Sequence, residues 1–181
     1  MLGERLVYDG PEVRVSEVDL GLPDGDRLPW DLVRLPRSAS VVLVDAQDRV
    51  LLVWRYRFTL DRWGWELPGG LVEDGEEPSQ TVARELEEVA GYRAGELALV
   101  VSYQPEPHSV DGEHVIFAGR NPEPIADAEL SDEAVRAEWV PAASVGQLIA
   151  AGHIWAAGTL IGLLGVCRAA MAGTLGCSGN G

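Results

Sequence analysis

Glu85 and Glu88 have a spacing that divalent-cation chemistry could use. On an α-helix, residues three apart lie about 60° from each other around the axis, so both carboxylates would project from one side. Paired glycines, Gly69 and Gly70, and an acidic loop precede them, which places the two glutamates at the rim of a glycine-bearing loop. Carboxylate oxygens are ligands that Mg²⁺ prefers, so the pair predicts a site for a hard divalent cation. A solvated acidic helix face, with Arg84 paired to Glu88, is the alternative interpretation.

The element that must position these glutamates is a short helix between Pro78 and Gly91. Proline fits the first turn of a helix, and glycine fits the position just past its end. Spacings of three and four predict one apolar face on this helix. The residues with these spacings are Val82, Ala83, Leu86 and Ala90.

The register of the whole stretch resembles the signature of the Nudix hydrolases, G-x5-E-x7-R-E-U-x-E-E-x-G-U. Eight of the nine specified positions match: Gly70, Glu76, Arg84, Glu85, Leu86, Glu88, Gly91 and Tyr92. The ninth departs from the signature, because Val89 stands where the family has the second glutamate of its pair.

This resemblance implies an α/β (α+β) fold, a Nudix-type α/β/α sandwich with a mixed sheet. It also implies hydrolysis of a nucleoside diphosphate derivative by water, with Mg²⁺ (or Mn²⁺ as a substitute) bridging enzyme and substrate. Glu85 and Glu88 would hold the metal together with the main-chain carbonyl of Gly69. The other matching residues, Gly70, Glu76, Arg84 and Gly91, would be architectural. Because Val89 cannot coordinate a metal, a catalytically impaired domain that binds nucleotides or acts as a regulator is the alternative.

Features outside this segment resemble the ADP-ribose and sugar-nucleotide pyrophosphatase branch of the family. They are the strand LLVWRYRF, the WELPGG entry to the glycine loop, Pro107, and the closing segment from AEWVP onward. The implied substrate is ADP-ribose or a related sugar nucleotide, cleaved to two monophosphates. Relatives in this branch commonly dimerise through N-terminal strands, so a homodimer is expected.

Four residues are expected to contact the nucleotide: Arg55, Arg57, Pro107 and Glu113. Arg55 and Arg57 alternate with aromatic residues and could form forked hydrogen bonds to a phosphate, although they could equally pair with surface acids. The resemblance places the catalytic base on a loop before the last strand, where Glu133 is the choice over Glu129 and Asp132. A surface charge cluster explains these acids equally well.

The composition of the 181-residue chain limits its partners. With 29 acidic and 14 basic residues, the net charge of -15 argues against nucleic-acid or anionic-membrane binding. A small anionic substrate would be repelled unless a cation intervened. The N-terminus has no apolar run of signal-peptide length, and the two cysteines have no metal-ligand spacing. A cytoplasmic protein is therefore expected.

Strand and helix patterns divide the chain into three parts. Residues 1–38 are expected to form a small N-terminal β extension with a possible role in dimerisation, and residues 39–172 the hydrolase domain. Residues 173–181 are expected to be a disordered tail. Within the domain, two central apolar strands would flank a turn at 45–48, and helices would begin near Ser144 and at Ile154.

Overall fold

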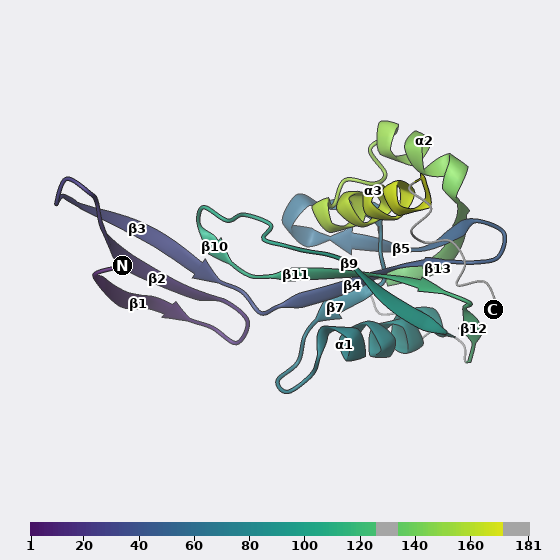
Figure 1. Ribbon diagram of the computed structural model, residues 1–181, viewed down its shortest axis with the longest axis horizontal. Coiled ribbons are helices and arrows are strands. Elements are labelled where there is room, and N and C mark those ends of the chain that lie inside the picture. Colours follow the sequence, from purple (N-terminus) through teal and green to yellow (C-terminus); the bar gives the residue numbers. More distant parts are fainter. Residues whose placement is uncertain (126–133, 172–181) are drawn as a thin grey trace, which may run out of the picture.

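The computed structural model of the chain describes residues 1–125 and 134–171, so the predicted tail lies outside the described residues. Within these residues, the larger sheet has seven strands (Figure 1). Its order is β13 (Ala134–Pro141), β5 (Arg49–Arg57), β4 (Ser38–Val44), β11 (His114–Arg120) and β9 (Glu96–Tyr103), with β6 (Arg62–Glu66) beside β5 and β7 (Gly69–Leu71) beside β4. Strands β4 and β11 are parallel and the other pairs are antiparallel, so the sheet is mixed as predicted.

The two central strands are buried on both faces. Val41 and Leu43 of β4 face one side of the sheet, and Val42 faces the other, because side chains alternate along a strand. Leu51 and Leu52 of β5 divide in the same way. The prediction of two central strands with two-sided burial is confirmed.

Helices cover both faces of this sheet, which makes the molecule a sandwich (Figure 1). On one face lies α1 (Pro78–Glu85), which packs Val82 against β4 and β5. On the other face, α2 (Val145–Ala150) and α3 (Ala157–Met171) lie over the core that contains Leu163. The α/β/α architecture expected from the sequence is therefore confirmed.

Local details differ from the sequence expectations. The chain from Leu86 to Ala90 is a π-helix rather than a continuation of α1, and it ends at Gly91 with a positive φ of 69°. Ala83 is exposed, so the apolar face of this helix is narrower than its spacing suggested. Ser144 makes no side-chain capping hydrogen bond, and the helix expected from Ile154 begins at Ala157.

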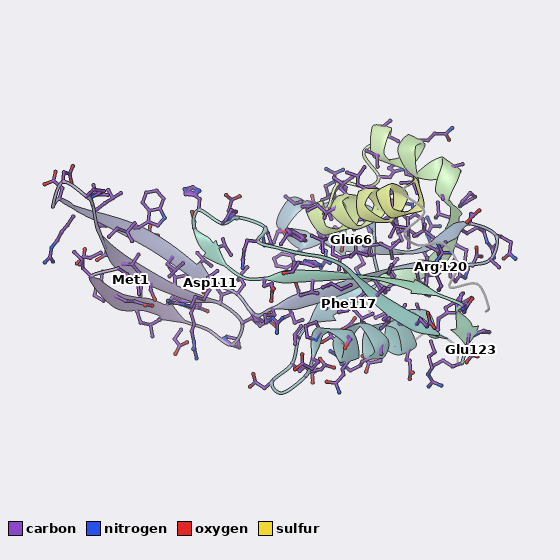
Figure 2. All side chains as sticks on the ribbon, viewed as in Figure 1. Met1, Glu66, Asp111, Phe117, Arg120 and Glu123 are labelled. Carbon is purple, nitrogen blue, oxygen red and sulfur yellow. The ribbon has the colours of Figure 1, made fainter. Side chains whose placement is uncertain are left out.

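A second sheet extends from the sandwich (Figure 1). It contains β1 (Gly3–Asp9), β2 (Arg14–Gly21), β3 (Arg27–Arg34) and the short β10 (Val110–Asp111). These strands confirm the predicted N-terminal β structure. Figure 2 shows Met1 beside this sheet, far from Glu66 in the sandwich. The remaining short elements are a pair of strands, β8 (Tyr92–Arg93) and β12 (Glu123–Pro124), and 3-10 turns at Phe58–Leu60 and Ala142–Ser144. None of the described helices is long and apolar enough to cross a membrane.

Candidate active site

Arg84 ties the acidic loop to α1. Its Nε lies 3.1 Å from Glu76 Oε1 and its Nη2 lies 3.2 Å from Glu76 Oε2, a forked pair. Glu76 also accepts hydrogen bonds from the Thr81 hydroxyl (2.7 Å) and the Glu73 amide (3.2 Å). Hydrogen bonds from Arg84, and secondarily from Thr81, lower the pKa of Glu76 to about 2, and the same pairing raises the pKa of Arg84. Glu76 therefore acts as an ionised anchor for the loop.

The same guanidinium brings Glu85 and Glu88 together. Nη1 of Arg84 donates to Glu85 Oε1 at 3.1 Å and to Glu88 Oε2 at 3.4 Å. The Glu85 side chain is 14% exposed, whereas that of Glu88 is 56% exposed. The intervening Glu87 pairs instead with Arg93. We name the group Glu76, Arg84, Glu85 and Glu88 the acidic edge.

Paired glycines allow the main chain to approach the acidic edge. A Cβ atom on Gly70 would lie 2.1 Å from Glu85 Oε1, so any side chain at this position would force the carboxylate to move. A Cβ atom on Gly69 would lie 2.3 Å from the Ala39 carbonyl oxygen and 2.7 Å from Ser40 Cβ. The glycines therefore let β7 pair closely with β4 and place Glu85 against the main chain.

The chemistry of the acidic edge fits a hard cation. Four carboxylates, those of Glu73, Glu76, Glu85 and Glu88, lie within 4 Å of one guanidinium. Their excess negative charge, together with main-chain oxygens, suits Mg²⁺, which usually binds one or two carboxylates and keeps several waters. Residues 1–125 and 134–171 contain no group of three or more His, Cys, Asp or Glu side chains placed to hold a metal. Val89, half-buried in the π-helix, contributes no such oxygen.

A cavity of about 780 Å³ opens beside the paired glycines. Arg55 and Arg57, both predicted to contact the nucleotide, line it together with Gly69 and Gly70. Arg57 donates from Nε to Glu66 Oε1 at 2.9 Å. Glu66, only 9% exposed, is a buried carboxylate in the cavity wall. The structure thus gathers the arginines and the glycine loop around one space.

The other predicted site residues lie elsewhere. Pro107 is exposed in the loop after β9 and does not line the cavity. Glu113 also lies outside the lining: it accepts hydrogen bonds from Ser102 and from Arg37 (2.7 Å). These two partners, Ser102 first, lower the pKa of Glu113. Glu133 lies outside the described residues.

Other residues in the cavity wall were not singled out by the sequence. Besides Glu66 they include Ser40, His114, Trp155 and Thr159, which come from β4, β11, the segment just before α3 and the first turn of α3. Only Glu66 had a local signal, because it lies within WELPGG just before the glycine loop. The three histidines are scattered along the sequence, so nothing distinguished His114.

Comparison with known proteins agrees with this geometry. Residues 34–160 match the NUDIX domain. The chain is 40% identical, over 91% of its length and 80% of the relative, to a CMP-5'-(N-acetyl-N-hydroxy-3-aminopropyl)phosphonate hydrolase of Streptomyces rubellomurinus. It is 27% identical to an ADP-ribose pyrophosphatase of Mycobacterium tuberculosis, over 91% of this chain and 81% of that one.

The fold also has a solved counterpart. The crystal structure of an ADP compounds hydrolase superposes with a TM-score of 0.82 at 21% identity, covering 96% of this chain and 94% of that one. An ADP-ribose pyrophosphatase of Bacillus subtilis is 30% identical over 61% of this chain and 60% of its own. Enzymes of this family generally use divalent metal ions. The chain belongs to the Nudix family, in its ADP-ribose pyrophosphatase branch, and is a diphosphohydrolase.

Proposed function

We propose that the protein hydrolyses the diphosphate linkage of ADP-ribose or a related sugar nucleotide to two monophosphates, with Mg²⁺ as its cofactor and Mn²⁺ as a substitute. One observation carries this proposal. Oxygens of Glu85 and Glu88 both lie within 3.4 Å of Arg84 Nη1, and Gly70 joins this acidic edge to the cavity. A small nucleotide in that cavity would have its diphosphate beside the carboxylates.

The roles of the residues follow from their positions. Glu85, Glu88 and the carbonyl of Gly69 would hold the cation, which when bound neutralises diphosphate charge and lowers the pKa of water. Arg55 and Arg57 line the same cavity and offer positive charge to the phosphates. The buried carboxylate of Glu66 orients Arg57 by accepting its Nε hydrogen. Glu133 remains the predicted base.

A nucleoside monophosphate joined to a phosphonate is a second candidate substrate. The similarity to the Streptomyces rubellomurinus enzyme, 40% identity over 91% of this chain, favours it. The name of that enzyme describes a substrate in which CMP is linked to a phosphonate, and hydrolysis of such a substrate would make similar demands on a cation-holding acidic edge.

A substrate panel tests the proposal. Purified protein would be incubated with ADP-ribose, sugar nucleotides and a CMP-linked phosphonate, each with Mg²⁺, Mn²⁺ or a chelator, and the released monophosphates measured. We expect metal-dependent turnover, and a loss of about 100- to 1000-fold in kcat for Glu85→Gln. The matched control is Glu87→Gln, since Glu87 lies on the same segment but pairs with Arg93.

The same panel distinguishes a hydrolase from the alternative, a catalytically impaired domain that binds nucleotides or acts as a regulator. Full activity of Glu85→Gln, or turnover in chelator, would contradict the cation site. Tight nucleotide binding without turnover at any metal concentration would favour a binding or regulatory protein instead.

We further propose that residues 1–38 mediate a homodimer, leaving residues 39–172 as the hydrolase unit. Strand β1 exposes several apolar side chains at 53% or more: Leu6, Val7 and Tyr8. Exposed apolar patches of this kind mark protein interfaces. Sedimentation should give twice the 19.5 kDa chain mass, and Leu6→Asp should shift it toward one chain. A wild-type protein that sediments as one chain at all concentrations would contradict the dimer.

A further inference from the structure

His114 lies at the meeting point of three elements in the cavity wall. It begins β11, its Nε2 lies 3.1 Å from Ser40 Oγ on β4, and its ring stacks on Tyr103 of β9 with centroids 5.2 Å apart. A Cβ atom on Gly158 would lie 3.0 Å from both His114 Cε1 and Tyr103 Oη. The first turn of α3 therefore closes over the ring edge. We name Ser40, Tyr103, His114 and Gly158 the neutral wall.

The neutral wall is continuous with the acidic edge. Ser40 is the register partner of Gly69 in the pairing of β4 with β7, and it is only 6% exposed. Gly70, the next residue, contacts Glu85. The cavity lining therefore runs from Gly70, which contacts Glu85, through Gly69 and Ser40 to His114. A ligand that places its diphosphate beside Gly70 would extend toward the imidazole.

The imidazole itself is held in an uncharged environment. Burial lowers the pKa of His114, so its neutral form predominates at pH 7. Glu113, the carboxylate just before β11, does not line the cavity and binds Arg37 and Ser102 instead. Tyr103, the other titratable group against the ring, has its pKa raised by burial and is also neutral.

One ring nitrogen is left for a ligand. Nε2 of His114 makes its hydrogen bond with Ser40. Nδ1 makes no hydrogen bond within residues 1–125 and 134–171, and it is not a buried polar atom that lacks a partner. In a neutral imidazole one nitrogen donates and the other accepts, and the tautomer depends on the direction of the Ser40 bond. A hydroxyl both donates and accepts, so it matches Nδ1 in either tautomer.

We propose that His114, oriented by Ser40, is a specificity residue whose Nδ1 binds a sugar hydroxyl of the substrate. This inference rests on the proposed function, since it assumes that a sugar nucleotide occupies the cavity. It adds an uncharged recognition point to a site whose other proposed contacts, the acidic edge and the two arginines, are charged. The hydroxyl belongs either to the nucleoside ribose or to the sugar on the distal phosphate.

Two amide variants separate ligand binding from a purely structural role. In His114→Asn, the amide takes the place of Nδ1 and loses the Ser40 contact. In His114→Gln, the amide of the longer side chain reaches the Nε2 position and keeps the contact with Ser40, but no polar atom remains at the Nδ1 position. We expect His114→Gln to raise KM for ADP-ribose about fivefold to tenfold with little change in kcat, the loss expected for one hydrogen bond. His114→Asn should raise KM less than His114→Gln does, because its amide keeps the Nδ1 position.

If His114 had only a structural role, its contact with Ser40 would matter most, and His114→Asn would raise KM more than His114→Gln. That ranking would overturn the proposal. Binding of the α,β-methylene analogue of ADP-ribose in Mg²⁺, measured by calorimetry, gives the same ranking without turnover. Two further substrates locate the hydroxyl: ADP methyl ester lacks the distal sugar, and an ADP-ribose with a dideoxy nucleoside sugar lacks the hydroxyls of the nucleoside ribose. The increase in KM caused by His114→Gln should vanish with the substrate that lacks the hydroxyl bound by Nδ1. A defect that persists with both, or an analogue that the wild type does not bind, would overturn the assignment.

The two proposals fail in different ways. Normal hydrolysis by the wild type with equal KM in both amide variants would remove only the role of His114. Absence of hydrolysis, with analogue binding that still ranks Asn above Gln, would remove only the enzymatic function.

Discussion

The acidic edge, which adjoins the cavity at Gly70, and the neutral wall, part of which lines the cavity, are built in opposite ways. The acidic edge comes from one segment of sequence, Glu76 to Glu88, and ion pairs to a single arginine hold it together. The neutral wall comes from β4, β9, β11 and α3, and a hydroxyl–imidazole contact, ring stacking and a missing Cβ hold it together. Charge is thus concentrated where a cation would sit, and uncharged groups line the far end.

This contrast teaches how the two regions respond to mutation. Carboxylates that hold a cation act on the transition state, so displacing them should lower kcat by orders of magnitude. Neutral groups that bind or support one end of the ligand contribute the smaller free energy of a hydrogen bond. The following changes test this contrast, from the largest expected effect to the smallest.

Gly70→Ala should break the acidic edge most severely without changing any charge. The new Cβ would lie 2.1 Å from Glu85 Oε1, so the carboxylate must move away from the main chain. A displacement of this size can cost about 100-fold in rate, which steady-state kinetics would measure. Gly146→Ala in α2 is the control, because its Cβ meets nothing within 4 Å. Equal kcat in the two variants would show that the Glu85 position is not critical.

Arg84→Lys should weaken the edge while keeping its charge. Lysine cannot reproduce the forked contact with Glu76 or reach both Glu85 and Glu88. Partners that orient metal ligands typically contribute about 10- to 100-fold in activity, and we expect the lower value here. Steady-state kinetics at several Mg²⁺ concentrations would check this, and an unchanged rate would assign Arg84 a role in folding alone.

The same variant has a pH signature. Glu76 has its pKa lowered from 4.5 to about 2, so its pairing stabilises the fold above pH 4.5, and this contribution is lost as the pH falls toward 2. Arg84→Lys should therefore be less stable than the wild type at pH 7, and the difference should shrink between pH 4.5 and 2. Urea unfolding across this range measures it, and a constant difference would contradict the assigned pairing.

The two regions also differ in how far the sequence predicted them. The placement of Glu85 and Glu88 close together in one helical segment followed from Pro78, Gly91 and the spacing between them, since helix geometry is local, although Glu85 ends α1 and Glu88 lies in the π-helix. The π-helix at Leu86–Ala90 had no local signal, because it depends on how the segment packs on β4 and β13. The two central strands, β4 and β5, could be predicted because their sequences are continuously apolar.

The far end of the cavity could not be predicted in this way. Which residues at the start of β11 face the cavity depends on the register of that strand, and a shift of one residue exchanges its two faces. The contact of His114 with Ser40 joins residues 74 positions apart. Pro107 was placed by resemblance alone, and the structure puts it outside the cavity lining.

Val89→Glu would sharpen the comparison by adding a carboxylate to the acidic edge. Val89 is half-buried in the π-helix that carries Glu88, and ligand charge count is one determinant of cation affinity. We expect the Mg²⁺ concentration for half-maximal activity to fall about fivefold. Ala83→Glu, which adds the same charge at an exposed position of α1, is the matched control. An identical shift in both variants would show a general charge effect instead of a new ligand.

Thr159→Val should test the support of the neutral wall with the smallest effect on turnover. Thr159 is buried in the first turn of α3, and its Oγ1 accepts the Leu67 amide hydrogen at 3.2 Å. Valine has nearly the same shape but cannot accept, so the buried amide is left unpaired at a cost of about 2 kcal/mol in the free energy of unfolding. Urea unfolding with an unchanged m-value would measure this loss, with the exposed Thr59→Val as the control.

Because Gly158 in the same turn contacts His114, KM should rise while kcat stays within about twofold, given that one neutral hydrogen bond is removed. A fall in kcat comparable to that of Gly70→Ala would instead show that the neutral wall and the acidic edge act as one unit.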